Sequence, residues 1–135
     1  MLLAPWAETR WITLSSCLLL LPSYYAYLRQ FYLYSAVVLG TSLVSANYWR
    51  HATYSWRRTL DLWVAKGTVT FFTVNGVLIY NIPFMVAAYG GLIPLIYFYY
   101  SSDAEFKANN RQWVLYHFLF HCMLIYETLL IIYVS

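Results

Sequence analysis

The sequence predicts an all-α, polytopic membrane protein: a bundle of about five transmembrane helices. Of its 135 residues, 62% are hydrophobic and only 10% are charged, whereas soluble domains carry about 25% charged residues. The apolar residues form long uncharged blocks, and a membrane-spanning helix needs about 20 such residues. The alternating pattern of a membrane β-strand is absent. We therefore expect one integral membrane domain over residues 1–135.

The first two spans are expected over about 11–28 and 31–49. The first, WITLSSCLLLLPSYYAYL, follows Arg10 and begins with apolar residues, as a signal peptide would. No small-residue cleavage site follows it, so we expect it to remain as a span. Pro22 lies near its far end, and the second span carries no charge.

The remaining spans are expected over about 62–80, 82–100 and 113–134. Lys66 is the one charge of the third span, and we expect its amine to reach the membrane interface. Gly90, Gly91 and Pro94 interrupt the fourth span. Small residues let helix backbones approach closely, so the two glycines indicate a helix contact.

The distribution of Lys and Arg predicts the orientation. One side of the predicted bundle carries nearly all of them: Arg10, Arg50, Arg57, Arg58, Lys107 and Arg111. Arg29 is alone on the other side. Positive residues stay on the cytoplasmic or equivalent side, which predicts an inside N-terminus and an outside C-terminus. The net charge of +3 is too small and too scattered to indicate nucleic acid, so the expected partner is the lipid bilayer.

Polar residues recur on one face of three predicted spans. A step of seven residues nearly completes two helical turns, so residues at that spacing share a face. The three faces, which we expect to look at each other, are Asp61, Thr68 and Asn75; Gly40, Asn47 and His51; and His117, His121 and Thr128.

Four residues of these faces converge on the inner side: His51, Asp61, His117 and His121. Three imidazoles and a carboxylate are ligands that zinc prefers, and the predicted metal ligands are these four residues. An open position would let the metal generate a nucleophilic hydroxide from water. Other roles remain open, since a lone histidine in a span often bonds to a neighbouring helix. Asp61 at a helix start would cap free amides.

Glu127 is a carboxyl at mid-depth of the fifth span. An unpaired charge there is costly, so the side chain is expected to face a neighbouring helix and to find a partner. Asn75 is the first candidate, because both residues lie about 21 Å along their helices at 1.5 Å per residue. A bond to a backbone carbonyl is the alternative.

The residues His51, Asp61 and the pair in HFLFH resemble the CREST superfamily of membrane hydrolases, which includes alkaline ceramidases and adiponectin-receptor-like proteins. That family carries a serine and a histidine on one helix, an aspartate near the start of the next and a late HxxxH pair. The resemblance implies zinc bound by the histidines, with the aspartate linked to the zinc-bound water, and hydrolysis of a lipid amide or ester.

The match is partial, because the family has seven helices and this chain offers five. Four residues before His51, where the family's serine would fall, stands Asn47, which becomes a catalytic candidate beside Asp61. Ser45 is two positions away, and we expect it to face elsewhere.

Three functions follow from the sequence. The first is a zinc-dependent lipid hydrolase, and the second is a non-catalytic accessory subunit of a larger membrane protein complex. The third is haem binding by His51 together with His117 or His121. Polar faces that meet each other favour a site, whereas polar faces that meet lipid-exposed partners favour the accessory subunit.

Reporter fusions test the predicted topology. With an odd number of spans, a reporter placed before Met1 should read out on the cytoplasmic or equivalent side, and one placed after Ser135 on the opposite side. Readout of both fusions on the same side would contradict the five-span prediction.

Overall fold

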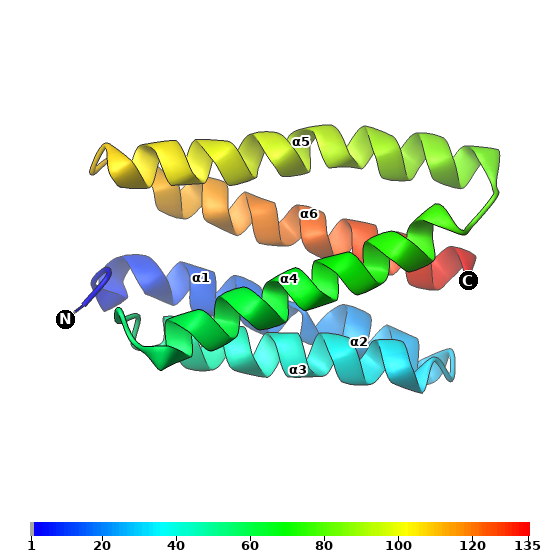
Figure 1. Cartoon of the computed structure of the whole chain (residues 1–135), viewed down its shortest axis with the longest axis horizontal. Helices are drawn as coiled ribbons and strands as arrows, with labels where there is room; N and C mark the ends of the chain where they lie inside the picture. The colour runs from blue at the N-terminus through cyan, green and yellow to red at the C-terminus, as the bar shows by residue number, and fades with distance from the viewer. Residues whose placement is uncertain (1) are drawn as a thin grey trace.

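The computed structural model describes residues 2–135 and confirms the all-α bundle; Met1, the first residue of the predicted domain, lies outside them. The helices are α1 (Trp6–Leu18), α2 (Leu20–Leu28), α3 (Tyr32–Trp49), α4 (Trp56–Val77), α5 (Ile82–Lys107) and α6 (Trp113–Val134). Because α1 and α2 run in one direction, the chain passes along the bundle five times, and its termini lie at opposite ends (Figure 1).

The first span is a single apolar segment interrupted at Leu19. Pro22 has no N–H to donate to the carbonyl of Leu18, so one bond of the helical ladder cannot form. The chain tightens there, and the Leu19 amide bonds to the Ser16 carbonyl at 3.2 Å. α3 occupies its expected range.

The helix α4 begins at Trp56, six residues before the expected start at 62. Its first turns are polar and were missed because the prediction followed apolar residues. They are stabilised from the preceding turn: Arg57 donates to the carbonyls of Asn47 at 3.2 Å and His51 at 2.7 Å. Asp61 therefore lies in the second turn of α4 and does not cap its first amides.

The helix α5 continues to Lys107, seven residues beyond the expected end at 100. This last part carries an exposed ion pair between Lys107 and Asp103 at 2.9 Å. The turn to α6 contains Asn109 at φ 58°, a conformation that asparagine tolerates better than most residues. α6 begins and ends where the sequence predicted.

Two helices form the middle of the bundle. α6 packs against α5, α1 and α2 and touches α4 lightly, while α3 packs against α1, α2 and α4. Three helical segments among the described residues are long and apolar enough to span a membrane: Trp6–Leu28, Ile82–Lys107 and Trp113–Val134. α3 and α4 are not among them, since α3 is rich in serine and tyrosine and α4 begins with several charges.

Hydroxyl and amide side chains join α3 to its neighbours. Ser23 and Ser35 exchange hydrogen bonds between α2 and α3, with Oγ–O distances of 2.8 and 2.9 Å. Toward α4, Tyr34 donates to Asn75 at 3.1 Å, and Thr41 bonds to Thr68. The predicted polar face of α4 therefore does look at α3.

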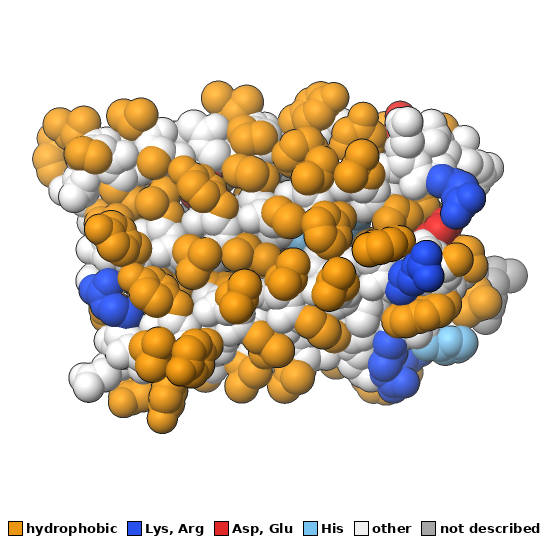
Figure 2. Space-filling view, turned by 180° about the vertical axis from the view of Figure 1, so that it is seen from behind, with side chains coloured by type: hydrophobic (Ala, Val, Ile, Leu, Met, Phe, Trp, Pro, Cys, Tyr) orange, Lys and Arg blue, Asp and Glu red, His pale blue; other side chains and the backbone are white. Residues whose placement is uncertain are grey.

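Most cations gather at the end of the bundle where α1 starts, α3 ends and α5 meets α6, here called the basic end (Figure 2). Aromatic rings lie beneath several of them: Arg10 over Trp11 at 5.2 Å and Arg58 over Tyr54 at 5.6 Å. Lys66 extends over Trp63 at 5.6 Å. Cations and aromatic rings arranged in this way are typical of a membrane interface.

At Gly91 the backbone of α5 lies directly against side chains of α6, and this contact gives a stability test. A Cβ at Gly91 would overlap Oε1 of Glu127 and lie 2.7 Å from the Tyr126 ring, whereas a Cβ at Gly90 would meet nothing within 4 Å. Gly91→Ala should lower the free energy of unfolding by about 1–3 kcal/mol through overpacking.

The matched control is Gly90→Ala, which should be neutral or slightly stabilising, because alanine has the higher helix propensity. Thermal denaturation of both variants in the same detergent measures the difference. Equal melting temperatures for the two variants would contradict the close α5–α6 contact.

Candidate functional site

Polar side chains from four helices lie inside the bundle, toward the basic end. All are buried or half-buried, although the surrounding sequence is apolar. We call them the polar cluster, and they are Ser15 and Ser16 of α1, Ser45 of α3, Asp61 of α4, and His117 and His121 of α6. Ionisable residues inside membrane helices are costly and mark functional sites by default.

The shortest contact of the polar cluster joins α1 to α6. Oγ of Ser15 lies 2.7 Å from Nδ1 of His121, and both side chains are buried. The same oxygen lies 2.8 Å from the carbonyl oxygen of Ile12, so its single proton has two acceptors to choose between. A hydroxyl and an imidazole at this distance have the geometry of a nucleophile and its general base.

The two histidines lie one above the other on α6, with ring centroids 4.7 Å apart. The ring of His117 meets the indole of Trp49 edge-on at 5.1 Å and that of Trp113 at 6.3 Å. Aromatic rings therefore fill the space on the basic-end side of the histidine pair.

A second chain of contacts links α1 and α3. Ser16 and Ser45 bond through their hydroxyls at 2.8 Å, and Ser42 donates to the Ser16 carbonyl at 2.7 Å. Asp61 is buried on α4 in the neighbourhood of Ser45.

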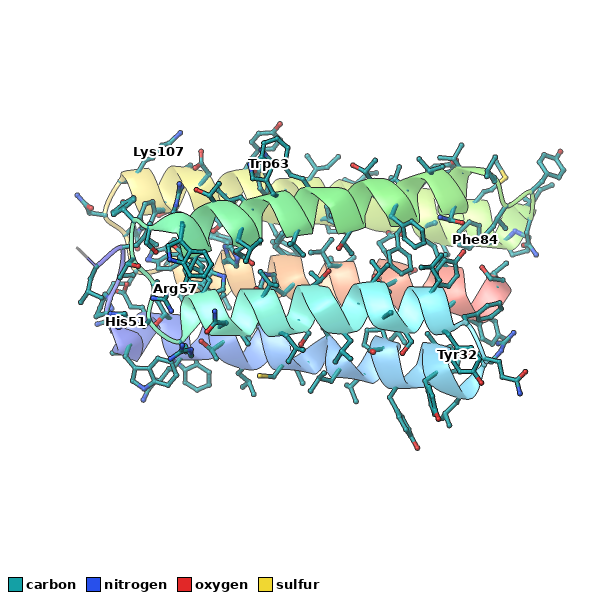
Figure 3. All side chains as sticks on the ribbon, turned by 60° about the horizontal axis from the view of Figure 1, so that its bottom comes forward. Tyr32, His51, Arg57, Trp63, Phe84 and Lys107 are labelled. Atoms are coloured by element: carbon teal, nitrogen blue, oxygen red, sulfur yellow. The ribbon has the colours of Figure 1, made fainter. Side chains whose placement is uncertain are left out.

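Of the predicted site residues, His117 and His121 are brought together, with ring centroids 4.7 Å apart, and Asp61 is buried separately on α4. His51 is exposed in the turn after α3, beside Arg57 (Figure 3). Asn47, the second catalytic candidate, accepts a bond from Arg50 at 2.8 Å on the outside of the helix end.

The implied zinc ion does not fit the side chains as they stand. Among residues 2–135, no three His, Cys, Asp or Glu side chains are placed to hold a metal ion together. Where a third imidazole would complete the shell, His117 meets the indole of Trp49, which is not a metal ligand. With His51 exposed, it does not join either α6 histidine as a haem ligand.

The sequence prediction missed the serines. Ser45 was expected to face elsewhere, yet it is buried and contacts Ser16. The predicted α3 face was the one that carries Asn47 and His51. A step of two residues rotates an α-helix by about 200°, so Ser45 lies on nearly the opposite face from Asn47. The face that looks inward instead carries Tyr34, Thr41 and Ser45. Two adjacent serines in an apolar run, SS at 15–16, were the available signal on α1.

Glu127 faces a neighbouring helix, as expected, but its predicted pairing with Asn75 is not formed. Asn75 accepts from Tyr34 and donates to the carbonyl of Phe71 at 2.7 Å. Glu127 lies against Gly91 of α5, and within the described part of the chain its buried Oε1 has no hydrogen-bond partner.

Comparison of the chain with protein-family models, with curated proteins and with solved structures found no match in any of the three.

A double-mutant cycle tests the second chain of contacts. Ser16→Ala and Ser45→Ala should each lower the free energy of unfolding by about 1 kcal/mol, since each removes the bond between the two buried hydroxyls. The double variant should lose less than the sum of the two, because one bond is shared. Strict additivity in denaturation curves would show that the two hydroxyls do not interact.

Proposed function

We propose that this protein hydrolyses an ester or amide bond of a membrane lipid, with Ser15 as nucleophile and His121 as its general base. The observation that carries the proposal is the 2.7 Å contact between Ser15 Oγ and His121 Nδ1, buried among apolar helices. The lipid substrate is what the resemblance to membrane hydrolases implies; that resemblance also implies zinc, and no step here depends on a metal.

The reaction follows from the ordinary chemistry of a serine–histidine pair. Ser15 Oγ adds to the carbonyl carbon while its proton passes to Nδ1 of His121. That proton then moves to the departing oxygen or nitrogen as the C–O or C–N bond breaks, which leaves the acyl group on Ser15. Water then adds to the acyl carbon as the same imidazole takes one of its protons. The bond between Ser15 Oγ and the acyl carbon breaks, the imidazolium returns the proton to Oγ, and the fatty acid leaves.

Asp61 acts in this proposal as a positioning residue. It is buried near Ser45, whose bond to Ser16 holds α1 beside α3. Loss of the carboxyl would let α1 shift against α6, and small displacements of a nucleophile lower the rate strongly.

The interpretation as an accessory subunit requires polar side chains on the outer surface of the bundle. It is favoured if polar faces meet partners outside the bundle, whereas the polar faces of α1, α3, α4 and α6 turn inward toward each other. The inward arrangement supports a site within this chain.

A fluorophosphonate probe, which reacts with activated serines, tests the nucleophile. Wild-type protein in detergent should be labelled, and mass spectrometry should place the label on Ser15. Ser15→Ala should abolish labelling, and His121→Gln should slow it by about 100-fold or more, the contribution of a general base.

The matched control is Ser23→Ala, which removes a buried hydroxyl outside the polar cluster and should leave the labelling intact. Labelling that survives Ser15→Ala would refute the proposed nucleophile. Elemental analysis separates the zinc-dependent version: about one equivalent of zinc, lost in a His117→Ala, His121→Ala double variant, would support metal hydrolysis in place of the serine mechanism.

A further inference from the structure

An open groove of about 580 Å³ lies between the first turns of α1 and α6, at the basic end. We call it the α1–α6 groove; its volume is in the range of about 300–1,000 Å³ that is usual for small-molecule sites. Both helices start at this end, so higher residue numbers lie deeper in the bundle. The polar residues at the mouth are Glu8, Arg111 and Gln112, and the apolar residues below them include Trp11, Leu115 and Phe118. A membrane lipid has the same order, with its head at the interface and its chains below.

The mouth of the α1–α6 groove carries one negative and one positive side chain. Glu8 Oε1 lies 3.6 Å from Arg111 Nε, which is longer than a hydrogen bond. The side chain of Glu8 is 17% exposed and that of Arg111 is 81% exposed. Among residues 2–135, neither side chain forms another ion pair or a side-chain hydrogen bond. The guanidinium therefore keeps N–H groups to donate, and the carboxylate keeps oxygens to accept.

These two charges determine which headgroup fits. A headgroup with only a negative charge would bind Arg111 but would also meet the carboxylate of Glu8. Phosphate matches the planar fork of arginine, and an ammonium with N–H donors matches a carboxylate. A headgroup that joins a phosphate to an ammonium through an ethylene linker satisfies both side chains.

The ammonium that fits is a primary one. A quaternary ammonium has no N–H to donate and is recognised by aromatic faces instead. In the α1–α6 groove the Trp11 ring already lies under the guanidinium of Arg10, at 5.2 Å. The Glu8 carboxylate is thus the group that receives the ammonium, and it favours one that can donate hydrogen bonds.

The α1–α6 groove follows the helix contact that leads to the reacting pair. On α1, Trp11 and Ser15 are four residues apart, and on α6, Phe118 and His121 are three residues apart. Residues at these spacings share one face of a helix. Because Ser15 and His121 meet at 2.7 Å between the two helices, the groove lies along the same contact. Ser15 is about 10 Å deeper than Glu8, at 1.5 Å per residue.

We propose that the α1–α6 groove binds a phospholipid with an ethanolamine headgroup. Its phosphate accepts from Arg111, and its ammonium donates to Glu8. Its acyl chains lie against Trp11 and Phe118. The inference deepens the proposed function, and rests on it, in taking this lipid as the substrate: the ester groups of a phospholipid lie deeper in the membrane than its phosphate, as Ser15 lies deeper than Glu8.

Photocrosslinking tests the headgroup. The full chain in phosphatidylcholine nanodiscs is exposed to a phosphatidylethanolamine probe with a diazirine on one acyl chain, and crosslinks found by mass spectrometry should fall on groove residues of α1 and α6. Unlabelled phosphatidylethanolamine should displace the probe about tenfold better than phosphatidylglycerol, which has no ammonium. Phosphoethanolamine in the buffer, a head without chains, should not displace it. Equal displacement by the two lipids, displacement by phosphoethanolamine, or crosslinks outside the groove would overturn the proposal.

Charge variants test the two contacts separately. Glu8→Gln should abolish the preference for phosphatidylethanolamine over phosphatidylglycerol, whereas Arg111→Gln should reduce labelling by about tenfold or more. The matched controls are Asp103→Asn and Lys107→Gln, which change an exposed ion pair at the same end but outside the groove. Both controls should label as wild type does. Equal losses in Arg111→Gln and Lys107→Gln would show a general attraction to the basic end and would overturn the proposal.

Two alanine variants test the groove as a space. Ala7→Phe places a ring in the α1–α6 groove and should remove most of the labelling. Ala104→Phe, on an exposed part of α5 at the same end, should not change it. Melting temperatures confirm that each variant is folded. Labelling unaffected by Ala7→Phe would count against binding in the groove.

These outcomes are independent of turnover, and Ser15→Ala should be labelled by the lipid probe as wild type is. If a fluorophosphonate fails to react with Ser15 while the lipid probe still distinguishes the two headgroups, the serine mechanism fails and the groove proposal stands. If Ser15 reacts but the two lipids displace the probe equally, the groove proposal alone fails.

Discussion

Hydrogen bonds between side chains of neighbouring helices are the constraint on which this bundle depends. Inside a bilayer, apolar side chains gain little by turning from lipid to protein, so packing and interhelical hydrogen bonds must select the arrangement. Here hydroxyl groups join α1 to α6, α1 to α3, α2 to α3 and α3 to α4. Between α6 and α5 the bond is made by a phenol: the Tyr126 hydroxyl donates to the Ala87 carbonyl at 3.2 Å. The polar cluster is the densest part of this network, so the same contacts that hold the helices also position the proposed reacting groups.

Apolarity was enough to predict the class of fold and most of the helices. α3 and α6 lie within a residue of their predicted ranges, because their apolar runs end where the helices end. The errors occurred where helices extend past the apolar core. Trp56 to Asp61 and Ser101 to Lys107 are helical yet polar, and only tertiary contacts such as Arg57 on the carbonyl of His51 explain the earlier start of α4.

The candidate site was predictable in its ionisable part and not in its neutral part. A histidine pair and a carboxyl in apolar sequence attract notice because they are costly, and the side chains of Asp61 and His121 are buried. Serine is common in membrane helices, so nothing about Ser15 or Ser45 alone separates them from Ser35. The rotation of α3 about its axis decides which of its residues face inward. The sequence prediction was wrong by two positions and placed Asn47 in the site where the structure has Ser45. Only packing fixes that rotation.

The spacing of the α3–α4 bonds has a mechanical consequence. Tyr34 and Thr41 are seven residues apart, and so are their partners Asn75 and Thr68, so both bonds form in a single register of the two antiparallel helices. If α4 slides along α3, both bonds break together instead of one after the other. A molecule that displaces Asp61 along the helix axis would therefore also break the Tyr34–Asn75 bond. Asn75 is fourteen residues from Asp61, about 21 Å at 1.5 Å per residue. The two bonds thus make α4 a rigid link between the basic end of the bundle and its opposite end.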